Sequence, residues 1–147
     1  NKYNSDLANG VGNLLERSFT MIIDFRGGVL GAKNGIDEKI KSSAEKAGKN
    51  YENNFDNYKL YFALADFFSF IKNLDRYIND EKPWVLNKNK DEKLDNVLNT
   101  LLFGIEKIIL WLEPFMPRKM QEAKKYLGKL KKSELKKGEK LGLFKRI

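Results

Sequence analysis

Apolar residues recur at intervals of three and four along most of this chain, which is the spacing of one face of an α-helix. The pattern predicts helices over residues 5–23, 36–49, 54–78 and 91–112, and a shorter fifth helix from Pro117 to about residue 128. No run alternates apolar and polar residues as a strand does. We therefore expect an all-α fold, a bundle of about five helices joined by short loops.

Prolines mark two of the predicted boundaries. Pro83 favours an extended conformation at the preceding Lys82, so the third helix should end before it. Residues 79–89 are then expected to form a connection between helices. Pro117 is suited to a first helical turn, where its missing N–H costs no hydrogen bond.

The third predicted helix has the broadest apolar face, and this face is rich in aromatic residues. Its members are Tyr58, Tyr61, Phe62, Ala65, Phe68, Ile71, Leu74, Tyr77 and Ile78. So broad a stripe is typical of a helix that packs in a core. We expect Phe67, Phe68 and Phe70 to serve packing rather than base stacking.

The composition limits the chemistry that this chain can perform. Its 147 residues, 41% of them hydrophobic, suffice for one domain with a core, and it has neither cysteine nor histidine. It also has no glycine-rich phosphate loop and no cluster of carboxylates. We therefore expect that this chain alone catalyses no reaction and binds no cofactor or metal. No stretch approaches the ~20 apolar residues of a membrane span, and no signal peptide is visible, so we expect a cytoplasmic protein with no membrane partner.

Positive charge is concentrated towards the C-terminal end. The formal net charge is +8, and the segment from Pro117 onward has 12 Lys and Arg against 3 Glu. Such a field attracts polyanions, although a lysine-rich surface can also serve solubility alone. We divide the chain into a helical bundle of residues 1–128 and a basic tail of residues 129–147.

The first predicted helix carries a polar row beside its apolar stripe. Asn9, Asn13 and Arg17 are four residues apart and should share one face. An amide offers donors and an acceptor in one plane, and a guanidinium offers a rigid fork of donors, which suits the edge of a nucleic-acid base. The same residues could instead bridge helix ends or face water.

Trp84 directly follows Pro83 in a polar connection, where a core position is unexpected. An exposed indole can stack on an unpaired base. Alternatively, the ring could close the end of the bundle against Tyr77 or Val85. Together with the polar row, Trp84 suggests a protein that holds unpaired nucleotides.

Four motifs, in order along nearly the whole chain, resemble the anticodon-binding domain of methionyl-tRNA synthetase. They are Asp6-Leu7-Ala8-Asn9-x-x-Gly12-Asn13-Leu14-x-x-Arg17, Tyr77-Ile78-x-x-x-x-Pro83-Trp84-x-Leu86, Leu112-Glu113-Pro114-Phe115-Met116-Pro117 and Leu143-Phe144-Lys145-Arg146-Ile147. Each motif is weak by itself, and the four together are specific.

The resemblance implies the helix bundle of a class I synthetase that reads the CAU anticodon of tRNA(Met). In that family the reading residues match Asn13, Arg17 and Trp84 here. Trp84 would stack on the first anticodon base, cytosine, while Asn13 and Arg17 would hold and discriminate bases. Asn9 and Pro83 would support them.

Two residues depart from the family pattern. Asp75 stands where the family often has asparagine, and Lys145 replaces a proline of the closing motif. Neither falls on a reading position, but Lys145 affects how the tail would dock on a catalytic body.

The family's "HIGH" and "KMSKS" motifs and its zinc knuckle are missing from this sequence. We therefore expect a C-terminal portion of a larger enzyme, which would join methionine to its tRNA using ATP and magnesium, with zinc a further candidate. The partners of the portion would be the anticodon loop of tRNA(Met) and the catalytic domain of the same polypeptide.

Two other interpretations stay open. The first is the equivalent bundle of a sister synthetase for leucine, valine, isoleucine or cysteine, against which the Pro-Trp turn argues. The second is a non-enzymatic helical adaptor, whose basic tail binds acidic partners or anionic lipid and whose Trp84 is buried.

Overall fold

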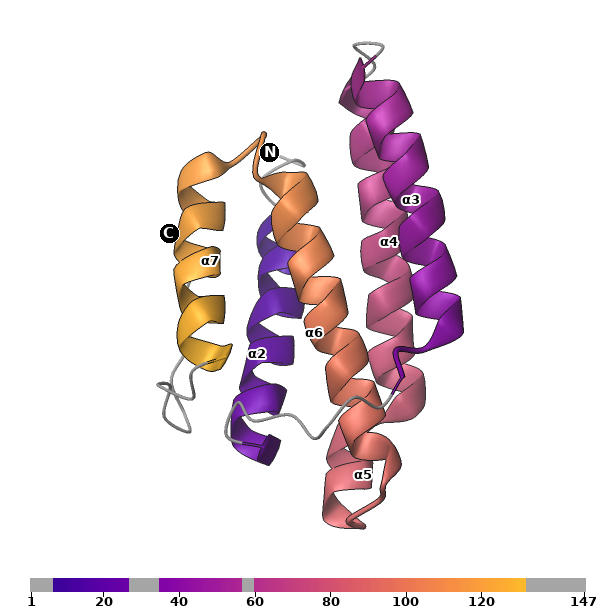
Figure 1. Ribbon diagram of the computed structural model, residues 1–147, viewed down its shortest axis with the longest axis vertical. Coiled ribbons are helices and arrows are strands. Elements are labelled where there is room, and N and C mark those ends of the chain that lie inside the picture. Colours follow the sequence, from indigo (N-terminus) through magenta and orange to yellow (C-terminus); the bar gives the residue numbers. More distant parts are fainter. Residues whose placement is uncertain (1–6, 27–34, 57–59, 132–147) are drawn as a thin grey trace.

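The computed structural model describes residues 7–26, 35–56 and 60–131, and every element within these ranges is helical (Figure 1). The long helices are α2 (Asn13–Arg26), α3 (Glu38–Asp56), α4 (Leu60–Glu81), α6 (Lys93–Leu112) and α7 (Pro117–Lys131). Two short helices, η1 (Leu7–Gly12) and α5 (Pro83–Lys88), complete the described part. The expected all-α fold with about five main helices is confirmed.

The helices form two groups that meet at α6. Helices α3 and α4 run antiparallel as a hairpin on one side, and α2 and α7 lie on the other (Figure 1). Helix α6 contacts all four of them, and α5 lies at the end of the bundle where α4 gives way to α6. Because α6 is central, its buried face is nearly continuous, from Leu94 to Leu112.

The core is aliphatic and aromatic, and α4 supplies a large part of it. Phe67, Phe70 and Leu74 are almost completely buried, as the expectation of a packing role for the phenylalanines requires. Two members of the predicted stripe are wrong, because Phe62 is 54% exposed and Ala65 is also exposed. The bounds predicted for this helix, 54–78, also differ from those observed, because residues 54–56 belong to α3 and α4 spans Leu60–Glu81.

The first predicted helix is divided in two. Its beginning, η1, is a π-helix of 6 residues, and the regular α-helix starts only at Asn13. A π-helix closes i→i+5 hydrogen bonds, so a four-residue interval no longer places two side chains directly above one another. Asn9 belongs to this π-helical turn and its side chain is outside the described residues, so its alignment with Asn13 and Arg17 stays a prediction.

The region predicted as a connection contains the helix α5. Lys82, expected to be extended, instead has φ 50° and ψ 68°, which is the left-handed conformation. Its N–H donates to the carbonyl of Ile78 and closes α4, while its own carbonyl accepts from Val85 and starts α5. Pro83 disfavours the α-helical conformation at Lys82. With Lys82 left-handed, a single residue ends one helix and begins the next.

The last described helix is longer than predicted. Helix α7 continues through Gly128 to Lys131, and Leu130 is buried. The division proposed between residues 128 and 129 therefore falls within a helix. The rest of the tail, including the closing motif with Lys145, lies outside the described residues.

Candidate nucleic-acid interface

Arg17 and Trp84 meet at the surface between α2 and α5. The guanidinium carbon of Arg17 lies over the indole, 5.3 Å from the ring centroid. Trp84 is 42% exposed, so the alternative in which it closes the end of the bundle is not what the structure shows. The ring is available to solvent and carries a cation on one face.

Two residues of α4 hold Arg17 from its other side. Its Nη1 lies 3.7 Å from a carboxylate oxygen of Asp75, and its Nη2 donates a hydrogen bond of 3.3 Å to the side-chain oxygen of Asn79. Both contacts are solvent-exposed, so each contributes little to the stability of the fold. The guanidinium therefore has contacts with α4 as well as with the indole of α5.

The other predicted site residues take different places. Asn13 is exposed one turn before Arg17 on α2, so these two share a face as predicted. Pro83 is buried at the first position of α5 and sets the start of the turn that carries Trp84. Asn9 lies in η1, and its side chain is outside the described residues.

A cavity of about 180 Å³ opens beside Arg17, between α2 and α4. Its lining residues are Gly10, Asn13, Leu14, Arg17, Ile71, Lys72 and Asp75. Leu14 and Ile71 are buried and give it an apolar floor, while the remaining side chains supply donors, an acceptor and charge at its rim. A flat group with hydrogen-bonding edges suits such a site.

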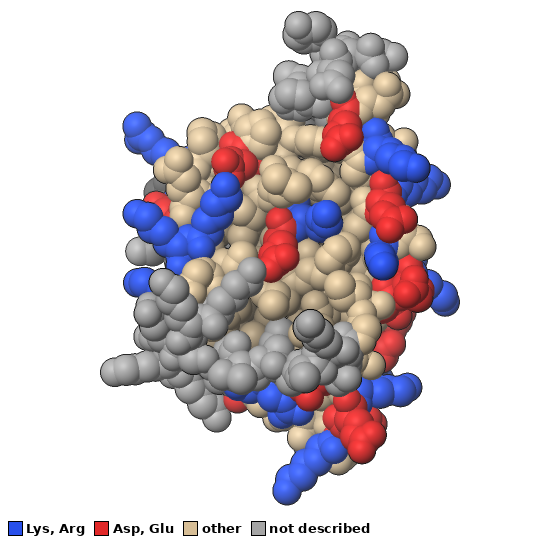
Figure 2. Space-filling view, viewed as in Figure 1, with Lys and Arg blue, Asp and Glu red and all other residues tan. Residues whose placement is uncertain are grey.

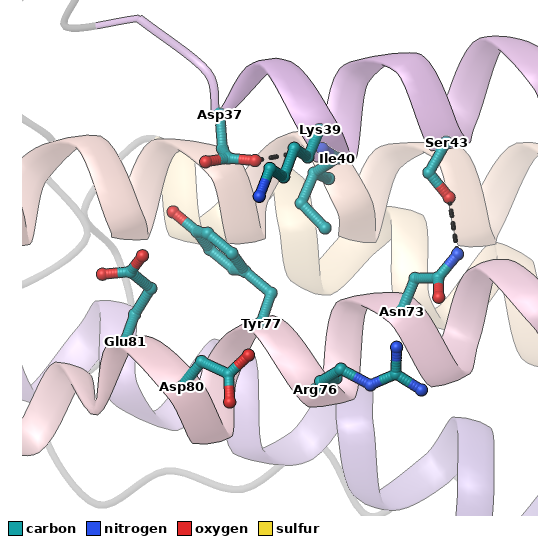
Figure 3. A pocket seen from close by; sticks show the side chains of 9 residues that line it. All are labelled: Asp37, Lys39, Ile40, Ser43, Asn73, Arg76, Tyr77, Asp80 and Glu81. Atoms are coloured by element: carbon teal, nitrogen blue, oxygen red, sulfur yellow. Dashed lines mark hydrogen bonds between the residues drawn. The ribbon is translucent and has the colours of Figure 1, made fainter.

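A larger cavity, of about 480 Å³, lies between α3 and α4 and differs in character (Figure 3). Asp37, Asp80 and Glu81 line it, against only Lys39 and Arg76 as cations, and this balance disfavours a polyanion. Asn73 donates a hydrogen bond of 2.8 Å to Ser43 across it. No predicted site residue lines this cavity.

Tyr77 also lines the larger cavity, and it belongs to the packing. Burial raises the pKa of Tyr77 to about 12, a hydrogen bond with Thr100 opposes the rise, and Asp37 and Glu81 add to it. The phenol therefore stays neutral at physiological pH.

Charge on the molecular surface is mixed rather than continuous. On the face in Figure 2, lysine and arginine side chains gather over α7 at the left edge, and both signs are interspersed over α3 and α4 at the right. Such a distribution favours local contacts over one broad basic groove.

Two further findings apply to the described ranges only. No group of three or more acidic residues in those ranges is arranged to hold a metal ion. Likewise, none of the helices described in this structure is long and apolar enough to cross a membrane.

Comparison with known proteins identifies the family. The family described as "Anticodon-binding domain of tRNA ligase" matches residues 37–142. The chain belongs to this family. The methionine–tRNA ligase of Deinococcus radiodurans is 35% identical over 132 residues, which cover 86% of this chain and 19% of that protein. The methionine–tRNA ligase of Thermotoga maritima is 37% identical over 125 residues, which cover 82% of this chain and 20% of that protein.

Solved structures show the same fold. Mycobacterium tuberculosis methionyl-tRNA synthetase in complex with methionyl-adenylate matches with a TM-score of 0.80 over 99% of this chain and 32% of that one. Its 20% identity shows the fold alone. The resemblance to the anticodon-binding domain of methionyl-tRNA synthetase is confirmed, and the chain spans about a fifth of the length of the curated relatives it matches.

Sequence reasoning missed two residues of this anticodon-binding domain that hold Arg17. The sequence marks Asp75 only as a departure from the family pattern, and it does not mark Asn79 as a site residue. Their four-residue spacing places both on one face of α4, which was a usable signal. Nothing in that spacing, however, could show that this face meets α2.

Proposed function

We propose that this domain reads the CAU anticodon of tRNA(Met), with Trp84, Arg17 and Asn13 as the residues that contact anticodon bases. Trp84 stacks on the first base, the cytosine, because its ring is exposed and flat. Arg17 and Asn13 hydrogen-bond to base edges, with Pro83 fixing the turn of Trp84 and Asn9 in support. The full-length parent ligates methionine to this tRNA using ATP and magnesium, with its catalytic body as the partner of this domain.

One observation carries the proposal. Residues from α2 and α5, far apart in the sequence, place an exposed indole and a guanidinium 5.3 Å apart at the surface. Indole and guanidinium planes are the groups on which unpaired bases stack, and guanidinium and amide groups hydrogen-bond to base edges. The juxtaposition supports recognition of single-stranded nucleotides rather than of a duplex.

The test is a titration of the protein with a CAU anticodon stem-loop and with a stem-loop changed only at the first anticodon position. We expect a preference for CAU of about fivefold or more at both low and high salt, corresponding to ~1 kcal/mol for one discriminated base. Base contacts are less sensitive to salt than phosphate contacts, so the preference should persist when overall affinity falls.

Equal binding of the two stem-loops, fading together as salt is raised, would contradict the proposal. That result would favour the basic-adaptor interpretation, in which charge alone attracts RNA. Preference for the anticodon of leucine, valine, isoleucine or cysteine would instead favour a sister synthetase.

A further inference from the structure

The cavity beside Arg17 joins a third element to the proposed interface. Asn13 and Arg17 reach it from α2, while Ile71, Lys72 and Asp75 reach it from α4. Of these α4 residues, Ile71 forms part of the floor, whereas Lys72 and Asp75 are exposed at the rim. Whatever enters the cavity therefore meets α4 as well as α2.

The three charged groups around the cavity are not equivalent. Arg17 is held by Asp75 at 3.7 Å, by Asn79 at 3.3 Å and by the ring of Trp84. Lys72 is exposed and, among the residues the structure describes, forms no ion pair. Asp75 already balances part of the charge of Arg17. Lys72 is therefore the cation at this rim that can pair with an anion of a ligand.

A nucleotide has two unlike parts, and the cavity offers a place to each. Its base is flat, weakly polar and edged with hydrogen-bonding groups, which suits the floor of Leu14 and Ile71 below Asn13 and Arg17. Its phosphate is charged and strongly hydrated, so it remains at the rim. A lysine binds phosphate as a mobile point charge and needs no fixed geometry.

We propose that Lys72 is a further RNA-binding residue of this domain and that it binds a backbone phosphate of the loop whose base enters the cavity. This inference rests on the proposed function, since it requires a single-stranded loop at the interface. Lys72 positions the strand and carries no sequence preference, because a phosphate looks the same in every nucleotide.

Lys46 provides a matched control. It is an exposed lysine of α3 and lines a different cavity, shared with Asp66 and with none of the predicted site residues. Lys72→Gln and Lys46→Gln each remove one positive charge from an exposed position away from the ends of a helix. A general effect of net charge on RNA binding appears in both variants, whereas a local phosphate contact appears in only one.

The experiment titrates wild type and both variants with the two stem-loops at 50 and 200 mM salt, after circular dichroism has confirmed that each variant is folded. Each phosphate contact to a single strand contributes about 0.7 to the slope of log affinity against log salt concentration. Losing one contact should therefore reduce the ratio of the affinity at 50 mM to the affinity at 200 mM by about 2.5-fold. We expect this in Lys72→Gln and a smaller change in Lys46→Gln. Both stem-loops should weaken by the same factor, and Lys72→Arg should restore the wild-type ratio.

Two results would overturn the inference while leaving the proposed function intact. The first is a salt ratio for Lys72→Gln that equals that of Lys46→Gln. The second is a loss of discrimination between the stem-loops in Lys72→Gln, which would make Lys72 a base contact. Wild-type protein that shows no CAU preference would overturn the proposed function itself.

Discussion

Among the described residues, the side chain of Arg17 makes polar or cation–π contacts with three side chains, each of a different kind. The indole of Trp84 attracts the guanidinium through the face of its ring. Asp75 forms an ion pair with it, and Asn79 accepts a hydrogen bond from it. All of these contacts are exposed to water, so each is worth about 1 kcal/mol or less. A base that stacks on Trp84 or bonds to Arg17 can therefore displace them at small cost.

Replacing Trp84 by alanine should weaken binding of the CAU stem-loop by ~1–3 kcal/mol, because the stacking surface for a base is lost. Folding should change little, since the ring is 42% exposed. Fluorescence anisotropy of a labelled stem-loop measures the binding, and Val85→Ala, an exposed neighbour on α5, is the control. A folded Trp84→Ala protein that binds normally would show that the site is assigned wrongly.

Replacing Asp75 by asparagine should strengthen binding of the stem-loop about two- to fivefold, because a negative charge is removed from the rim that meets RNA. The exposed ion pair with Arg17 contributes about 0–1 kcal/mol, so the melting temperature should stay close to wild type. Isothermal titration calorimetry measures the affinity, with Asp80→Asn on the same helix as control. Weaker binding would mean that Asp75 is needed to hold Arg17 in place.

At the scale of elements, α6 packs against α4 at a position occupied by a glycine. A Cβ added to Gly104 of α6 would lie 2.4 Å from Leu74 Cδ2, and Leu74 is fully buried. A larger residue at position 104 would therefore press on a side chain of the core. Gly128 in α7 differs, because a Cβ there would have no neighbour within 4 Å.

Replacing each of these two glycines by alanine should change the stability of the protein in opposite directions. Gly104→Ala should destabilise the protein by about 1–2 kcal/mol, because overpacking against Leu74 exceeds the gain in helix propensity. Gly128→Ala should stabilise it by about 0.5–1 kcal/mol, because propensity acts without a clash. Urea denaturation followed by circular dichroism measures both, and a stabilising Gly104→Ala would show that α4 and α6 are not closely packed there.

The ends of the elements were harder to predict than the elements themselves. Periodicity located the five long helices, since one apolar face repeats over many residues. It could not reveal α5, whose six residues are too few to show a period. The preference of pre-proline residues for extended conformations also did not predict the left-handed conformation of Lys82, the residue that joins α4 to α5.

At the scale of the whole molecule, charge and recognition occupy different regions. The basic excess belongs to α7 and the tail, while the candidate interface lies between α2, α4 and α5. Long-range attraction accelerates encounter with RNA, whereas contacts at the interface distinguish one loop from another. The two contributions should therefore be separable.

Deleting residues 132–147 tests this separation, because it removes six Lys and Arg and two Glu. We expect weaker binding of every stem-loop and a shallower dependence on salt, with the preference for CAU unchanged. Filter binding over a salt series provides the measurement, and the intact chain is the reference. Complete loss of binding would support the basic-adaptor interpretation, in which the tail is the site.

The sequence by itself determined the helical class, the main helices and a packing role for the aromatic residues of α4, because each follows from local spacing. It also predicted the three reading residues, through a motif. Tertiary structure alone decided which of these residues meet. Arg17 and Asn79 are 62 positions apart, and their contact depends on how α2 packs beside α4. Helix packing follows from the shapes of whole faces, so no local pattern could show that Trp84, Arg17 and the cavity at Lys72 share one surface.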